Sequence, residues 1–217
     1  MGGPGGTVRE AFDRALRRLA DPSLAPEGGA GPRLGARTGP VPASLRPLLP
    51  VDPVPAAVLV AFVDRGDDPG ILLTVRAAHL RKHAGQISFP GGRIEPGDAD
   101  PAAAAMREAQ EEIGLAPQGV TVVGQLPDQI VLTGFRITPV VALVQPEFSL
   151  LIDESEVTEV FEIPLDYIVD ERNYVPVQRR LQGVEVTLND LNYNGRVVWG
   201  ATAGMLQVLH RALQAQP

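Results

Sequence analysis

The sequence predicts an α+β or mixed α/β sandwich built around a mixed sheet. Apolar runs of strand length recur from Ala56 onwards, and few helical patterns separate them, so strand and helix do not alternate regularly. The length of 217 residues fits one ordinary domain, or one domain with an attached arm. The apolar content of 44% is enough for a hydrophobic core.

Residues 1–49 are predicted to form a helix and an irregular arm, and residues 50–217 the domain itself. In Thr7–Ala20, apolar side chains at helical spacing share one face. This pattern favours a helix packed on its own domain or on a partner subunit over a disordered tail. In residues 21–50, 12 of 30 positions are Gly or Pro, a density that prevents a regular helix or strand.

The domain is predicted to contain six strands and two helices. The strands are Ala56–Val63, Ile71–Val75, Val120–Leu126, Ile137–Val144, Val157–Ile163 and Val184–Leu188. The helices are Pro101–Ile113 and one near Thr202–Leu213. The first helix has clear ends, because Asp100 can cap it, Pro suits its first position and Gly114 can end it.

Composition and charge exclude several classes of protein. The net charge of −7 has the wrong sign for a protein that coats nucleic acid or an anionic membrane. The absence of cysteine excludes disulfides, thiolate metal sites and cysteine nucleophiles. No apolar run approaches a membrane span, and the N-terminus lacks the pattern of a secretory signal. We therefore expect a cytoplasmic protein, a monomer or a homodimer, without nucleic-acid or membrane partners.

A basic segment precedes the helix Pro101–Ile113. No acid occurs between Asp68 and Glu95. The basic and imidazole side chains of this segment are Arg76, His79, Arg81, Lys82, His83 and Arg93. Guanidinium groups match phosphate oxygens, so the segment is a candidate phosphate pocket; the alternative is a solvated strand and loop.

The helix itself is acidic on one face. Glu108, Glu111 and Glu112 stand at i, i+3 and i+4, and like charges at this spacing destabilise a helix unless something neutralises them. Arg107 can reach Glu111 but cannot balance three carboxylates. Mg²⁺ and Mn²⁺ prefer such oxygen ligands, so the face is a candidate metal site; the alternative is a solvated acidic face.

A glycine pair, Gly91 and Gly92, joins the basic segment to the acidic helix and lets the backbone approach a ligand closely. Basic groups would hold phosphates while the helix holds a metal that polarises them. This arrangement suits metal-assisted hydrolysis of a phosphoanhydride.

Gly92 and the segment Arg107–Leu115 resemble the Nudix box, G-x5-E-x7-R-E-U-x-E-E-x-G-U, in which U is aliphatic. The second half matches at every fixed polar and glycine position. The first half carries one extra residue, so that Asp98 takes the place of the first acid when counted forward from Gly92, and its role stays open. The resemblance implies the Nudix α/β/α sandwich and hydrolysis of a nucleoside diphosphate linked to another moiety.

The preceding segment, Leu72–Gly92, resembles the signature of coenzyme A pyrophosphatases: LLTxR, a small residue, then R, G and FPGG at fixed intervals. This resemblance implies a metal-dependent pyrophosphatase that converts coenzyme A or its thioesters to 3′,5′-ADP and (acyl-)4′-phosphopantetheine. One alternative is a Nudix pyrophosphatase for ADP-ribose, NADH or dinucleotides. Another is a catalytically silent Nudix domain that binds a nucleotide as a regulator.

The resemblance also implies roles for single residues. The ligands of Mg²⁺ or Mn²⁺ would be the carboxylates of Glu108, Glu111 and Glu112 and the carbonyl of Gly91. Arg107 would orient Glu111 or Glu112. The candidates for substrate binding are Arg76, Arg81, His83 and Gly92. The base that activates the attacking water stays open among Glu108, Glu111, Glu154 and Glu156.

Two features near the C-terminus are expected to have no part in the chemistry. Arg196 and Trp199 are expected to seal the sandwich, and Arg179 and Arg180 are expected to face solvent.

Overall fold

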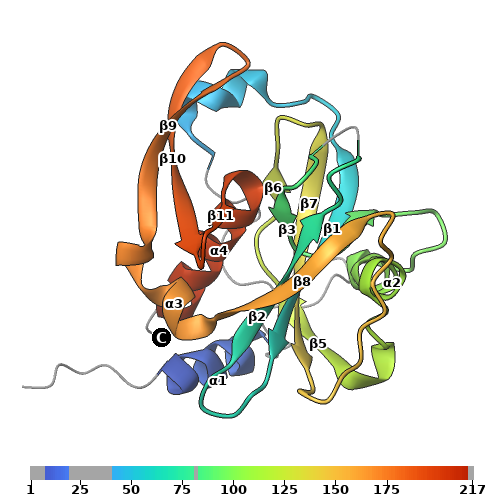
Figure 1. Cartoon of the computed structure of the whole chain (residues 1–217). Helices are drawn as coiled ribbons and strands as arrows, with labels where there is room; N and C mark the ends of the chain where they lie inside the picture. Colours follow the sequence, from blue (N-terminus) through green and yellow to red (C-terminus); the bar gives the residue numbers. More distant parts are fainter. Residues whose placement is uncertain (1–7, 20–40, 81–82, 215–217) are drawn as a thin grey trace, which may run out of the picture.

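The computed structural model describes residues 8–19, 41–80 and 83–214. Its central strand is β1 (Val54–Val63), whose apolar side chains alternate between the two faces of a sheet. Leu59 and Ala61 lie in one hydrophobic cluster, and Val60 and Phe62 lie in another. The strand is therefore buried on both faces, and the predicted mixed sandwich is confirmed (Figure 1).

The main sheet, as far as the described residues show it, has eight strands. Besides β1 they are β2 (Gly70–Arg76), β3 (Ile87–Ser88), β4 (Gly91–Arg93), β5 (Val120–Gln125), β6 (Gln129–Ile130), β7 (Phe135–Val144) and β8 (Val157–Pro164). The order is β3-β2-β1-β7-β5, with β4 on β1, β6 on β7 and β8 on β2. β1 and β7 run parallel, and the other pairs are antiparallel, so the sheet is mixed.

Helices cover both faces of this sheet (Figure 1). α2 (Pro101–Ile113) packs its small side chains against one face. The other face is covered by α1 (Val8–Leu19), α3 (Leu165–Val169) and α4 (Gly200–Gln214). Phe12 of α1 is buried, and its ring centroid lies 4.5 Å from that of Phe62. No helix within the described ranges has the length and hydropathy that a membrane crossing requires.

A second, antiparallel sheet lies beyond α4, on the side away from α2 (Figure 1). Its strands are β9 (Tyr174–Leu181), β10 (Val184–Tyr193) and β11 (Arg196–Val198). Leu191 and Val198 join the same core as α4, so the second sheet belongs to the domain. The remaining elements are the 3₁₀ helices η2 (Ala43–Leu48), η3 (Pro117–Gly119) and η4 (Glu171–Asn173). The short η2 lies in the segment expected to be irregular, and residues 20–40 of the predicted arm lie outside the described residues.

All six predicted strands and both predicted domain helices are present, and α2 has its predicted bounds. Asp100 Oδ1 accepts a hydrogen bond of 2.8 Å from Ala103 N, and Gly114 ends the helix in the left-handed region at φ 68°. The sequence does not predict β3, β4, β6 or β11, because strands of two or three residues are too short to show a period of two. It also does not predict β9, in which no residue is fully buried, or the five-residue α3.

The expectation that Arg179 faces solvent is wrong. Arg179 forms an ion pair with Asp190, which is 3% exposed, and its guanidinium lies 4.4 Å from the ring centroid of Trp199. Because the charge of Asp190 is buried, it needs a cation, and only the pairing of β9 with β10 brings Arg179 to it. Arg180 is exposed, as expected.

Arg196 fastens the second sheet to the main sheet. It forms an ion pair with Glu159 of β8, and its guanidinium lies 4.7 Å from the ring centroid of Phe161 on the same strand. The expectation that this part of the chain seals the sandwich is confirmed.

Candidate active site

The candidate site lies where β4 passes between β1 and α2. A Cβ atom on Gly91 would come within 2.4 Å of the carbonyl oxygen of Ala57, and one on Gly92 within 2.4 Å of the carboxylate of Glu108. Position 91 therefore requires glycine because of the backbone of the neighbouring strand, and any larger residue at position 92 would displace the carboxylate of Glu108. The close approach brings the backbone of β4 against the carboxylates of α2.

Glu112 is the most buried of these carboxylates, with 3% of its surface exposed. Its Oε2 accepts a hydrogen bond of 3.1 Å from the backbone N–H of Gly91, and its Oε1 lies 3.6 Å from Nη1 of Arg76. Burial raises the pKa of Glu112 to about 7, although the Gly91 hydrogen bond and the charge of Arg76 act to lower it. The Gly91 hydrogen bond and the charge of Arg76 therefore do not fully offset the cost of burying the negative charge of Glu112.

Glu108 and Glu111 differ in their exposure. Burial raises the pKa of Glu108, although hydrogen bonding to Arg107 opposes this effect, and the charges of Glu111 and Glu156 raise it further. The Glu111 side chain is 60% exposed. Glu156 and Glu108 also raise the pKa of Glu112, so Glu108 lies within electrostatic reach of the other three carboxylates. We call Glu108, Glu111, Glu112 and Glu156 the carboxylate cluster.

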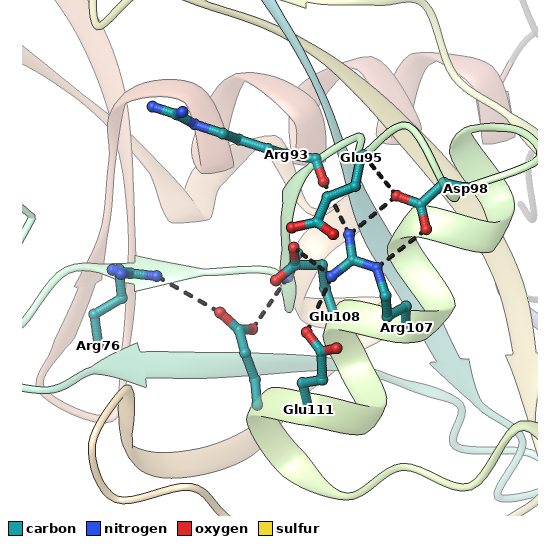
Figure 2. A network of polar contacts seen from close by, with 9 residues as sticks. Arg76, Arg93, Glu95, Asp98, Arg107, Glu108 and Glu111 are labelled. Carbon is teal, nitrogen blue, oxygen red and sulfur yellow. Dashed lines mark hydrogen bonds and ion pairs between the residues drawn. The ribbon is translucent and has the colours of Figure 1, made fainter.

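Arg107 connects this cluster to the loop before α2 (Figure 2). Its Nη1 donates hydrogen bonds of 3.0 Å to Glu108 and to Glu111, and its Nη2 donates one of 3.0 Å to the carbonyl of Arg93. Hydrogen bonds to Asp98 and Glu108 raise the pKa of Arg107. The guanidinium thus holds Glu108 and Glu111, but no contact joins it to Glu112 among the interactions of the described residues.

Asp98 holds Arg107 from the opposite side. Its two carboxylate oxygens each accept a hydrogen bond of 3.0 Å from Arg107, and Oδ2 also accepts one of 2.7 Å from the backbone N–H of Glu95. These bonds lower the pKa of Asp98, first through Arg107 and then through Glu95. Asp98 binds Arg107, and Asp100, two positions later, caps α2. The one-residue insertion in the Nudix box is therefore compatible with both contacts.

The loop before β8 is fastened to the end of α2. The backbone N–H of Leu151 donates to the carbonyl of Ile113 at 2.9 Å, and that of Asp153 donates to the carbonyl of Glu112 at 3.0 Å. A Cβ on Gly114 would lie 2.7 Å from the nitrogen of Leu151, so the approach of the loop depends on this glycine. The loop thereby satisfies two carbonyls that the end of a helix leaves free.

The same loop is tied to the end of β2. The N–H of Ala77 donates to the carbonyl of Glu156 at 2.8 Å, and Nε2 of His79 lies 3.1 Å from the carbonyl of Ser155. These contacts hold Glu156 beside the cluster, whereas Glu154 does not enter the electrostatics of Glu108 or Glu112. The sequence offers Glu154 and Glu156 of this loop as alternatives but does not reveal its contacts, because their partners lie about 40 and 80 positions away.

The candidates for substrate binding are placed unequally. Arg76 is 27% exposed beside Glu112, and Gly92 lies against Glu108. His83 is exposed and its Nδ1 lies 2.8 Å from Gln86 Oε1, so within the described residues it does not join the cluster. Arg81 and the neighbouring Lys82 lie outside the residues that the structure describes.

The side chains of the described residues do not enclose a metal ion as they stand, because no three His, Asp or Glu side chains converge closely enough. Arg107 explains this arrangement, since its guanidinium occupies the space between Glu108 and Glu111. Arg107 uses one oxygen of Glu108 and one of Glu111, so the second oxygen of each carboxylate makes no hydrogen bond with Arg107.

Comparison with known proteins identifies the family. The NUDIX domain model matches residues 53–188. NudL, an uncharacterized Nudix hydrolase from Salmonella paratyphi B, is 46% identical over 164 residues, which are 75% of this chain and 84% of NudL. NudL from Salmonella newport matches equally well. The crystal structure of RenU, a Nudix hydrolase from M. smegmatis, has a TM-score of 0.52 at 20% identity, over 76% of this chain and 88% of RenU. This structural likeness shows the fold alone. On the domain match and the NudL relatives together, the chain belongs to the Nudix hydrolases.

Proposed function

We propose that the protein is a divalent-metal-dependent pyrophosphatase for coenzyme A or its thioesters. The products are 3′,5′-ADP and (acyl-)4′-phosphopantetheine. The observation that carries the reaction class is the carboxylate cluster packed against Gly91 and Gly92. The observation that favours coenzyme A is the resemblance of the segment Leu72–Gly92, which leads directly into that cluster.

The residues of the cluster fit a divalent cation. Nudix hydrolases generally need a metal such as Mg²⁺ or Mn²⁺. In this chain, Glu112 is buried with a raised pKa, and the neighbouring carboxylates raise that pKa further, so a cation is the missing compensation. Glu108, Glu111 and Glu112 would hold the ion, with the carbonyl of Gly91 as a further ligand. When bound, the ion polarises the pyrophosphate and lowers the pKa of a water.

Side chains of this protein position the metal ligands, bind the substrate and accept a proton. Arg107 positions Glu108 and Glu111, and Asp98 positions Arg107. Arg76, whose charge lies at the buried end of the cluster, binds a phosphate oxygen of the substrate. Glu156 takes the proton of the attacking water, because its loop holds it beside the metal-binding carboxylates while leaving it exposed.

A product assay tests the substrate. The purified protein is incubated with Mg²⁺ or Mn²⁺ and coenzyme A, ADP-ribose, NADH or a diadenosine polyphosphate, and the products are separated by chromatography. We expect 3′,5′-ADP from coenzyme A at the highest kcat/KM. Much faster turnover of ADP-ribose or NADH would contradict coenzyme A as the substrate but would still support hydrolysis of a pyrophosphate. Binding of nucleotides without turnover of any of them would identify a regulator instead.

Thermal unfolding with and without Mn²⁺ tests the metal separately. A ligand that binds only the folded state stabilises it, by about 2.7 kcal/mol at a hundredfold excess over Kd. We expect the melting temperature to rise with Mn²⁺, and to rise much less in Glu112→Gln. An acidic face that binds no metal would show no rise in either protein.

A further inference from the structure

Arg93 is a cation beside the candidate active site that the proposed mechanism does not use. Its side chain is exposed, and its backbone carbonyl accepts a hydrogen bond from Arg107. Its guanidinium lies 5.6 Å from the ring centroid of Phe135, the first residue of β7. Among the described residues, no carboxylate lies within ion-pair distance of Arg93, so its charge is available to a ligand.

The direction of the Arg93 side chain separates it from the scissile bond. A Cβ on Gly92 would point into the carboxylate of Glu108, and successive side chains of a strand point to opposite sides. Arg93, the next residue of β4, therefore points away from Glu108. Figure 2 shows the same arrangement: the carbonyl of Arg93 faces Arg107, and its side chain extends away from Arg107 and Asp98.

The ring of Phe135 lies beside the guanidinium of Arg93 and limits the positions that it can take. A guanidinium held over the face of an aromatic ring keeps N–H groups free for a ligand, and the contact restricts the conformations of the arginine side chain. The free edge matches two oxygens of a phosphomonoester, which carries more charge than a phosphodiester and is the stronger partner.

We propose that Arg93 and Phe135 form a subsite for a phosphomonoester on the nucleotide half of the substrate, apart from the pyrophosphate that is hydrolysed. This inference rests on the proposed function for its ligand, since coenzyme A carries a 3′-phosphate on its ribose. The subsite selects coenzyme A over dephospho-coenzyme A and lies outside the segment Leu72–Gly92 that suggests the substrate.

Binding of two small nucleotides tests the subsite without any need for turnover. Calorimetry in the presence of Mg²⁺ compares 3′,5′-ADP with 5′-AMP, which lacks the 3′-phosphate. We expect wild type to bind 3′,5′-ADP about tenfold to a hundredfold more tightly, the usual range for a charge-assisted contact. Arg93→Ala should remove this preference, and Phe135→Leu should reduce it.

Arg136→Ala is the matched control. Arg136 is exposed, follows Phe135 on β7 and therefore points to the opposite side of the strand, and the change removes the same charge. We expect this variant to keep the wild-type preference. Arg93→Lys separates charge from shape, because it keeps the charge without the planar fork, and it should keep only part of the preference.

Three results would overturn the subsite: equal binding of both nucleotides by wild type, an unchanged preference in Arg93→Ala, or an equal loss for both nucleotides in that variant. The kinetic counterpart is a fall in kcat/KM of Arg93→Ala on coenzyme A that dephospho-coenzyme A does not show. Failure of wild type to hydrolyse coenzyme A would count against the proposed function, while the nucleotide preference would still decide on the subsite.

Discussion

Glu112 combines deep burial with a negative charge, and the two properties predict opposite effects of removing the charge. For catalysis, Glu112→Gln deletes a metal ligand from the buried end of the cluster. We expect turnover to fall by several powers of ten, or about 4 kcal/mol or more in barrier at ~1.4 kcal/mol per decade. The measurement is kcat over a titration of Mg²⁺. Turnover near that of wild type at modest Mg²⁺ would show that Glu112 is not a ligand.

In the absence of metal, Glu112→Gln should raise the free energy of unfolding. The pKa of Glu112 is about 7 in the folded protein and about 4.3 in an unfolded chain. Between these values the folded state binds a proton that the unfolded state has released, so the free energy of unfolding falls as pH rises. We expect wild type to lose about 3 kcal/mol relative to Glu112→Gln between pH 4 and pH 8.

Urea unfolding of both proteins over this pH range, in the presence of a chelator, measures that difference. The other carboxylates are common to both proteins, so their contributions cancel. Parallel pH profiles of wild type and Glu112→Gln would mean that the burial of this carboxylate does not shift its titration.

Glu154 and Glu156 provide a matched pair for identifying the base. Both lie in the loop before β8, but only Glu156 enters the electrostatics of Glu108 and Glu112. We expect Glu156→Gln to lower kcat by about a hundredfold to ten-thousandfold, the usual contribution of a general base. Its KM and its Mn²⁺-induced rise in melting temperature should change little. Glu154→Gln should keep wild-type kcat; an equal loss in both variants would point to the loop and not to the base.

At the scale of elements, the end of α2 and the loop that carries Glu156 behave as one unit. Gly114 has φ 68°, and the backbone of Leu151 lies within 2.7 Å of where its Cβ would be. Gly66 has a similar φ of 72°, but no atom beyond its chain neighbours lies within 4 Å of where its Cβ would be. Gly66→Ala therefore measures the cost of the left-handed conformation alone, about 1–2 kcal/mol.

Gly114→Ala should lower the free energy of unfolding clearly more than Gly66→Ala does, because the loop before β8 must also move away from α2. We expect kcat to fall in Gly114→Ala at temperatures where the variant is fully folded, and to stay unchanged in Gly66→Ala. Chemical unfolding and steady-state kinetics on both variants make the comparison. Equal losses of stability in the two variants, with unchanged kcat, would show that the contact between this loop and α2 does not affect the active site.

At the scale of the molecule, the N-terminal helix contributes to the core. Phe12 is 1% exposed and packs on Phe62 of β1. We expect Phe12→Ala to cost about 3–5 kcal/mol, or roughly 10 °C in melting temperature for a chain of this size. The exposed Arg14 on the same helix is the control, and Arg14→Ala should change the melting temperature little. A similar melting temperature for Phe12→Ala and wild type would place α1 outside the cooperative unit.

Where neighbours in the sequence decide the structure, prediction from the sequence succeeds. The bounds of α2 follow from Asp100, Pro101 and Gly114, which act within one helical turn. The shared face of the three carboxylates on α2 follows from the helical period. The longer strands of the main sheet, such as β1 and β7, follow from runs of buried side chains that β-branched and other apolar residues supply locally.

Where the structure depends on how distant segments pair, the sequence by itself is insufficient. It indicates that Arg107 can reach Glu111, but not that Asp98 holds Arg107 from the other side or that Glu156 joins the cluster in place of Glu154. It places Arg179 in solvent, whereas the pairing of β9 with β10 places it on a buried carboxylate.

The sequence by itself therefore determined the family, the mixed sandwich and the acidic face of the helix, because motif spacing, caps and periodicity act over a few residues. Only the tertiary structure decided which charges are paired, how deeply Glu112 is buried and which loop reaches the cluster. The physical reason is that electrostatic interactions and burial depend on distance in space. The pairing of β4 with β1 and of β8 with β2 sets that distance, in the second case between residues about 80 positions apart in the chain.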